Sequence, residues 1–169
     1  MADTLVDQWK LPKFRRSGRS LATEGRWAGE TVVILKPQTF MNRSGEALHP
    51  LRSSAGFEVS RDLLVLVDDF ALPLGTFRLR ALGSAGGHNG LRSVEAALGT
   101  NTYARLRIGI GPVPADVDDP ADFVLAPLAR HERAVLIDLL PGLADAVECW
   151  LDEGIEEAMN RFNRRGTTE

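Results

Sequence analysis

Two short, uninterrupted apolar runs constrain the fold of this 169-residue chain more than any other feature. Residues 31–35 and 63–67 consist of hydrophobic and β-branched side chains, a composition typical of buried strands. Segments with helical spacing of apolar residues alternate with such runs, which indicates an α/β fold. We expect residues 1–169 to form one three-layer α/β/α domain around a mixed, mostly parallel sheet.

Local signals place the other elements. We expect helices over residues 2–9 and 91–98, the second stopped by Gly99. A long helix is expected over roughly 129–152, with a short one from about 155 to 162. Alternation predicts strands over 76–80 and 103–110. Residues 13–19 and 116–122 are expected to be loops, and Ser44 can cap a helix that includes Ala47 and Leu51.

The net charge of −3 conceals an asymmetry along the chain. Residues 1–107 contain 15 lysines and arginines against 10 acids, whereas residues 108–169 contain 5 against 13. Seventeen of the 20 basic residues are arginine, whose planar guanidinium suits bidentate contacts to phosphate. An anionic partner would therefore favour the first two-thirds of the chain, although a merely solvated surface explains the composition equally well.

A first polar cluster, residues 36–45, follows the first apolar run. It joins Phe40 and Met41 to the amide of Asn42, and this mixture suits a pocket with an apolar wall and a few directed hydrogen bonds. The alternative is a loop pinned to the core by Phe40 and Met41.

Asp68 and Asp69 come directly after the second run. A carboxylate in this position can orient a histidine, hold a metal or cap the next turn. Metal binding is the weakest of the three, because His49, His88 and His131 show no ligand spacing.

A third cluster, residues 86–90, reads Gly-Gly-His-Asn-Gly and leads into a predicted helix. Glycines let the backbone approach a ligand, and a helix N-terminus offers free N–H groups to an anion. The segment lacks the P-loop and dinucleotide fingerprints, so a tight turn is the alternative. All three clusters lie at strand ends or at a helix start, where α/β sheets bind ligands.

Taken together, these clusters resemble those of the bacterial peptidyl-tRNA hydrolases, and the resemblance extends over residues 2–163. It rests on collinear stretches at residues 36–45, 67–69 with 72–75, 86–91, 105–111 and 157–163. It implies hydrolysis of the ester between a peptide and the 3′ end of tRNA, without a metal or other cofactor. The family uses a histidine as general base and an aspartate that orients it.

Roles follow from the resemblance by position. Asp68 matches the orienting aspartate, and Asn42 matches the asparagine that binds substrate near the reacting carbonyl and orders water or stabilises the oxyanion. The positions implied to bind the peptide and the terminal nucleotide are Phe40, Met41, His88 and Asn89. Arg80 and Arg107 fall where the family contacts tRNA phosphates; a solvated strand face and an internal salt bridge are the alternatives. Arg164 and Arg165 could touch the acceptor arm or belong to a frayed terminus.

One part of the family pattern has no counterpart here. The family opens with an apolar strand, a Gly-Asn-Pro-Gly loop and the catalytic histidine in a Thr-Arg-His-Asn context, and this sequence contains neither motif. None of His49, His88 and His131 takes that place by position. We therefore expect a chain truncated relative to the family, with the first strand absent. The alternative function is a tRNA- or RNA-binding relative with impaired catalysis.

The remaining features concern location. No run is long enough to cross a bilayer and the N-terminus shows no signal pattern. The single Cys149 excludes an intramolecular disulfide and is expected in the core. We expect a cytoplasmic protein, and the resemblance implies a monomer that acts in translation by freeing tRNA from stalled peptides.

Overall fold

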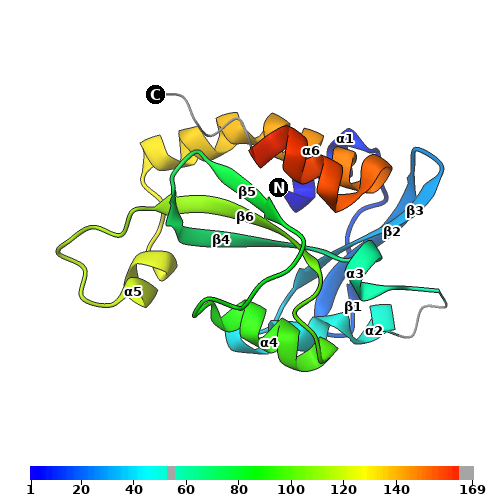
Figure 1. Ribbon diagram of the computed structural model, residues 1–169, viewed down its shortest axis with the longest axis horizontal. Helices are drawn as coiled ribbons and strands as arrows, with labels where there is room; N and C mark the ends of the chain where they lie inside the picture. Colours follow the sequence, from blue (N-terminus) through cyan, green and yellow to red (C-terminus); the bar gives the residue numbers. More distant parts are fainter. Residues whose placement is uncertain (53–55, 164–169) are drawn as a thin grey trace. The chain divides into compact units, whose positions relative to one another are not determined.

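The computed structural model describes residues 1–52 and 56–163 as a mixture of helices and two small sheets (Figure 1). The described chain divides into two compact units. Unit 1 contains Met1–Asp62 and Gly83–Thr102, and unit 2 contains Leu63–Leu82 and the chain from Tyr103 onward. The α/β class expected from the sequence is confirmed.

The sheet of unit 1 is an antiparallel meander. It is formed by β1 (Arg15–Ser17), β2 (Ser20–Trp27) and β3 (Glu30–Pro37), in that order. Ala28 and Gly29 connect β2 to β3, and both have positive φ, at 47° and 92°, as a tight two-residue hairpin turn requires. The expectation of a loop over residues 13–19 was wrong, because residues 15–17 pair with β2. Neither β1 nor β2 contains an apolar run, so these strands are defined by their pairing and not by a hydrophobic pattern.

The apolar run at residues 31–35 lies in β3, as expected, but it is not buried on both faces. Val32 is buried at 7% exposure, whereas its neighbour Val33 is 41% exposed. An antiparallel meander can leave one face in water, so a continuous apolar run did not imply a covered strand here.

Five short helical segments complete the described part of unit 1. They are α1 (Ala2–Gln8), η1 (Met41–Leu48), α2 (His49–Arg52), α3 (Val59–Asp62) and α4 (Asn89–Leu98). Gly99 ends α4 in the left-handed conformation at φ 71°, as predicted. Ser44 does not cap a helix. It lies inside the 3₁₀ helix η1, where its hydroxyl donates to the Met41 carbonyl at 2.8 Å.

The sheet of unit 2 has the order β4-β6-β5 and is mixed. It contains β4 (Leu64–Pro73), β5 (Phe77–Arg80) and β6 (Ala104–Gly111); β4 is parallel to β6 and β5 is antiparallel to it. Among the described strands, three of the four pairings are antiparallel. A mixed sheet was predicted correctly, but mostly parallel pairing was not. Short turns connect the unit 1 strands, and such connections permit only antiparallel pairing.

Strand β4 continues well past its apolar run, to Pro73. Asp68 and Asp69 therefore lie within the strand and not after it. Two glycines of β6 permit the continuation. A Cβ atom on Gly109 would lie 2.1 Å from the Pro73 carbonyl oxygen, and one on Gly111 would lie 2.0 Å from that of Phe70. Only glycine allows the two backbones to approach this closely.

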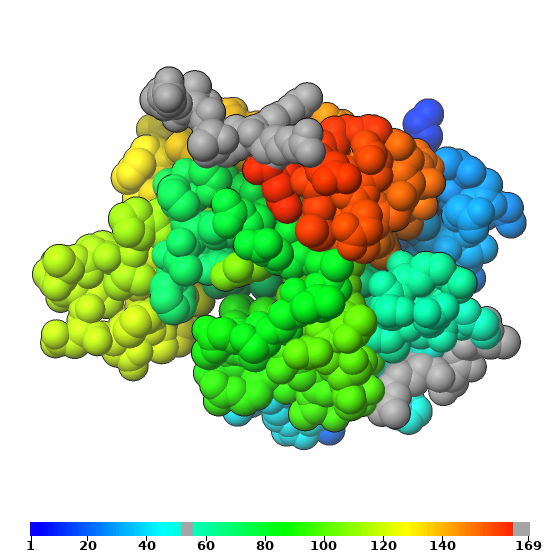
Figure 2. Space-filling view, in the orientation of Figure 1, coloured from blue at the N-terminus to red at the C-terminus, as the bar shows by residue number. Residues whose placement is uncertain are grey.

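Up to residue 163, where the described chain ends, unit 2 contains two helices. The long α6 (Arg130–Phe162) was predicted as two helices, and it is broken at Gly154, whose φ and ψ are 83° and 175°. Its end packs on β5, with the rings of Phe77 and Phe162 6.2 Å apart. The short α5 (Pro120–Leu125) begins inside the expected acidic loop and extends beyond it, so the loop expectation was wrong for residues 120–122. Figure 2 shows its segment, in yellow-green, on the surface at the left of the view.

Cys149 is buried as predicted, and burial raises the pKa of its thiol.

No helix in residues 1–52 and 56–163 is both long enough and apolar enough to cross a bilayer.

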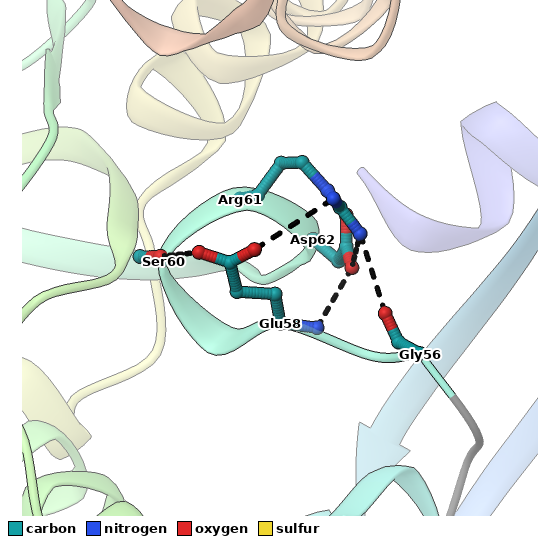
Figure 3. Close-up of polar contacts among 5 residues, drawn as sticks. All are labelled: Gly56, Glu58, Ser60, Arg61 and Asp62. Atoms are coloured by element: carbon teal, nitrogen blue, oxygen red, sulfur yellow. Dashed lines mark hydrogen bonds and ion pairs between the residues drawn. The ribbon is translucent and has the colours of Figure 1, made fainter.

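A cluster of polar contacts surrounds the short helix α3 in unit 1 (Figure 3). The guanidinium of Arg61 binds both carboxylate oxygens of Asp62, at 2.6 and 2.8 Å. Asp62 also accepts from the backbone N–H of Glu58 at 2.8 Å, and Ser60 donates to the Glu58 side chain at 2.8 Å. Arg61 holds the pKa of Asp62 below its ordinary value.

The variant Asp62→Asn should therefore lower the free energy of unfolding at pH 7 by roughly 0.5 kcal/mol, the size of an exposed ion pair. A carboxylate with a lowered folded-state pKa stabilises the fold above the unfolded-state pKa of about 3.9. The difference from the parent chain should accordingly shrink as the pH falls through the folded-state pKa. Urea unfolding at pH 7 and near pH 2.5 measures it, with Asp7→Asn as the control for net charge. A difference independent of pH would contradict the ion-pair explanation.

Candidate active site

Two segments that are far apart in the sequence, η1 and α4, make close contact within unit 1. The backbone N–H of Gly45 in η1 donates to the hydroxyl of Ser93 in α4 at 3.0 Å. A Cβ atom on Gly45 would lie 2.2 Å from the Ser93 carbonyl oxygen. Glycine at position 45 therefore permits the approach of the two helices.

The same contact brings two sequence motifs together. A Cβ atom on Gly90 would lie 2.6 Å from the sulfur of Met41 and 2.9 Å from Cε1 of His88. Met41 therefore lies against the start of α4, beside His88. Asn42 follows Met41 and Asn89 follows His88, so the two predicted substrate-binding amides come from adjoining segments of unit 1.

The side chains of this cluster are open to solvent. Phe40 is 81% exposed and Met41 is 52% exposed, and Asn42 and Asn89 are also exposed. The alternative of a loop pinned to the core does not hold for Phe40. Exposed apolar and aromatic side chains in the same segments as exposed amides are the mixture expected of a surface that binds an apolar or planar ligand group.

His88 has a defined local role. It is the N-cap of α4, and its Nδ1 accepts a hydrogen bond from the backbone N–H of Leu91 at 3.2 Å. A neutral ring with Nδ1 as acceptor carries its proton on Nε2. His88 thus presents a hydrogen-bond donor at Nε2 and does not have its Nδ1 lone pair available for proton abstraction.

In unit 2, Asp68 and Asp69 point to opposite faces of the sheet, because successive residues of a strand alternate. Asp69 forms an ion pair with Arg107 and accepts from the Ala71 N–H at 2.9 Å. Asp68 lies opposite Ile108 in the pairing of β4 with β6. The turn-capping interpretation therefore describes Asp69, and the orienting role of Asp68 stays a prediction.

Four arginines share one face of β5 and β6. The register places Arg78 opposite Arg107 and Arg80 opposite Arg105. Like charges directly opposite one another are unfavourable unless an anion lies between them. Arg105 is 2% exposed, and its guanidinium lies 4.4 Å from the centre of the Tyr103 ring.

Of the two arginines predicted to contact phosphate, Arg80 is exposed and Arg107 is held by Asp69. The internal salt bridge considered for Arg107 is thus present, and contact of either residue with phosphate stays a prediction. The sequence reasoning missed Arg105. Its signal was the alternation of residues 105–107, but only the strand register reveals that Arg105 faces Arg80. Arg164 and Arg165 lie outside the described residues.

The variant Gly45→Ala tests the η1–α4 contact. Its Cβ would press on the backbone of α4, so the two helices must separate at a cost of about 2 kcal/mol. We expect that loss in urea unfolding followed by tryptophan fluorescence. The matched control is Gly142→Ala in α6, where the nearest atom, Cε1 of Phe77, would be 3.7 Å away. Alanine there should be neutral or stabilising by up to about 1 kcal/mol. Equal stability of the two variants would show that η1 and α4 are not closely packed.

The fold and these clusters define a class of protein: an α/β enzyme-like fold with a solvent-facing amide and aromatic cluster and an arginine-rich sheet face suited to a phosphorylated polymer. Within residues 1–52 and 56–163, no group of three or more histidines, cysteines or acids is arranged to hold a metal ion.

Comparisons with known proteins identify the family. The family model described as peptidyl-tRNA hydrolase matches residues 1–169, and the chain belongs to this family. The peptidyl-tRNA hydrolase of Gemmatimonas aurantiaca is 45% identical over 166 residues, which cover 97% of this chain and 87% of the relative. That of Chloroflexus aggregans is 45% identical over 161 residues, 95% and 85% of the two chains. The crystal structure of peptidyl-tRNA hydrolase from Acinetobacter baumannii superimposes with a TM-score of 0.85 at 27% identity, covering 96% of this chain and 82% of the other.

Proposed function

We propose that the chain hydrolyses the peptidyl-tRNA ester with the residue roles that its family resemblance implies. Asn42 acts at the reacting carbonyl and Asp68 orients the base. Phe40, Met41, His88 and Asn89 bind the peptide and the terminal nucleotide, and Arg80 and Arg107 contact tRNA phosphates. The observation that supports the proposal is the η1–α4 contact, which brings Met41 and His88 together. Asn42 and Asn89 are the residues that follow these two in the chain.

The chemistry requires few groups. A base removes a proton from water as the water attacks the ester carbonyl. The resulting tetrahedral oxyanion collapses, the bond to the tRNA 3′ oxygen breaks, and that oxygen receives the proton. The side-chain N–H groups of Asn42 can donate to the oxyanion, and a donor aimed at a developing charge lowers the barrier. The amide of Asn89 supplies a further donor for binding the substrate.

The arginines of β5 and β6 would bind the tRNA part of the substrate. Arginine contacts to phosphate add affinity without reading sequence, which suits an enzyme that acts on many tRNAs. The guanidinium of Arg107 carries several N–H donors. A phosphate would therefore either displace Asp69 from Arg107 or bind Arg107 together with Asp69. We further propose that the protein acts in the cytoplasm as a monomer.

The arginines of β5 and β6 support a second candidate function, that of a tRNA-binding relative with impaired catalysis. Such a protein would bind tRNA in a salt-dependent manner without releasing it from its peptide.

One experiment separates the two functions. Single-turnover release of tRNA from an N-acetylated aminoacyl-tRNA is measured for residues 1–169 and for the same chain preceded by a segment with the family's Gly-Asn-Pro-Gly loop and Thr-Arg-His-Asn histidine. The general-base contribution of about 10²–10⁴-fold should appear on adding the segment. Release by neither form would refute the proposed hydrolysis. If both forms bind tRNA in a salt-dependent manner and neither releases it from its peptide, the second function is established.

A further inference from the structure

A second concentration of positive charge lies in unit 1 and is distinct from the residues assigned so far. Residues 10–27 contain six lysines and arginines and one acid, Glu24. Two of the six are already engaged. Arg19 pairs with Glu46 at 2.9 Å, and Arg26 donates to the Gly29 carbonyl.

The other four define what we call the basic edge: Lys10, Lys13, Arg15 and Arg16. All four are exposed, and within the described part of the chain none of them forms an ion pair. Arg15 and Arg16 belong to β1, one of the two outer strands of the meander, and as successive residues they project from its two faces. Lys10 follows α1 with a positive φ of 53°, which a residue other than glycine adopts at an energetic cost.

The basic edge also has a concave part. Lys13 and Arg15 line a hollow of about 280 Å³, together with Pro12, Ala22, Thr23 and Glu24. Glu24 is the only acid among these lining residues. Lys13 and Arg15 thus line a recess large enough for a phosphate group. The carboxylate of Glu24 would repel an anion bound there.

We propose that the basic edge contacts backbone phosphates of the tRNA substrate. The inference rests on the proposed function for the identity of the polyanion, but it concerns a different surface from the Arg80 and Arg107 face. Arginine binds phosphate through two parallel N–H donors, and lysine binds it as a point charge. Four exposed cations without acidic partners supply the charge complementarity that such a backbone requires.

Charged side chains on an edge strand have another known use, because they discourage pairing with the edge of another chain. The two explanations differ in what neutral substitutions should do. If the charges only protect the edge, glutamines should increase self-association and leave tRNA binding unchanged. If the basic edge contacts RNA, the same substitutions should weaken binding and reduce its dependence on salt.

The test replaces all four residues with glutamine (K10Q, K13Q, R15Q and R16Q) and measures binding of a deacylated elongator tRNA between 50 and 300 mM salt. Removing one cation that binds a phosphate should lower the slope of log Kobs against log salt by about 1. We expect a decrease of about 2 or more and at least 10-fold weaker binding at physiological salt. An unchanged slope would overturn the proposal, and increased self-association with unchanged binding would replace it with edge protection.

Three further variants sharpen the result. The control R130Q with R133Q removes two exposed arginines from the start of α6 and should leave the slope unchanged, whereas R15Q with R16Q should lower it. In the opposite direction, E24Q should tighten tRNA binding a few-fold, because it removes the acid that lines the hollow. Equal effects of the two arginine pairs would show that net charge alone controls binding and would overturn the proposal. An E24Q variant that does not bind more tightly would show that no phosphate lies in the hollow, which would also overturn it.

The binding measurement is independent of turnover, so the two proposals can fail separately. If neither the chain nor its extended form releases tRNA but the glutamine variant binds tRNA more weakly, hydrolysis is refuted and the basic edge is retained. In a chain that does turn over, the variant should lower kcat/KM for full-length substrate and leave the rate on an N-acetylaminoacyl ester of adenosine unchanged. An equal loss on both substrates would refute a phosphate role.

Discussion

The variant Asp68→Asn is expected to lower single-turnover release of tRNA by about 10²–10⁴-fold, the usual contribution of a general base. Asparagine keeps the shape of aspartate but not its charge. It would neither favour the useful tautomer of the histidine nor stabilise the imidazolium that forms as water is deprotonated. The measurement is made on the chain that carries the Thr-Arg-His-Asn segment, so that the base is present.

Asp69→Asn is the matched control. Asp69 is the next residue of β4, faces the opposite side of the sheet and pairs with Arg107. Its replacement should change tRNA binding through Arg107 and leave the rate on the short adenosine ester unchanged. A full rate for Asp68→Asn, or equal losses on the short substrate for both variants, would refute the orienting role of Asp68.

The variant Asn42→Ala should reduce the single-turnover rate by about 10²–10³-fold, the effect of removing one donor to an oxyanion. Substrate affinity should change much less, because the interaction is strongest in the transition state. Asn42→Asp should be at least as slow, since it places a carboxylate where negative charge develops.

The control for this substitution is Asn160→Ala, which removes an exposed amide from α6 and should leave both kinetic parameters unchanged. A variant Asn42→Ala that binds substrate more weakly but turns it over at the parent rate would assign Asn42 to substrate binding alone.

The sequence predicted those elements whose own residues determine their ends. Gly99 stops α4 in a conformation that favours glycine, and the alternation after Tyr103 predicts β6. It failed for β1 and β2, where partner strands define the element. It also ended β4 too early at Asp68, because the extension to Pro73 depends on Gly109 and Gly111, some forty residues further along the chain.

In the candidate site too, the sequence predicted what local motifs determine and not what depends on distant partner residues. The motifs at residues 36–45 and 86–91 predicted that Met41 and His88 bind substrate. The structure brings those two side chains together. The arginine face could not be predicted in full, because the pairing of Arg80 with Arg105 follows from the register of β5 and β6. Nor did adjacency in the sequence reveal that Asp69 has its own partner while Asp68 faces the other way.

The side chain of Asn163, at the end of α6, has a consequence for the arginine face. Its Nδ2 donates to the Leu79 carbonyl at 3.0 Å and its Oδ1 accepts from the Leu79 N–H at 2.9 Å. An amide that offers one donor and one acceptor to an outer strand imitates a residue of a neighbouring strand. One uncharged side chain thus occupies hydrogen-bonding groups of β5 that another protein chain could otherwise use. It also fixes the strand that carries Arg78 and Arg80 to a residue 84 positions beyond Leu79, so the placement of these cations depends on how the last helix ends.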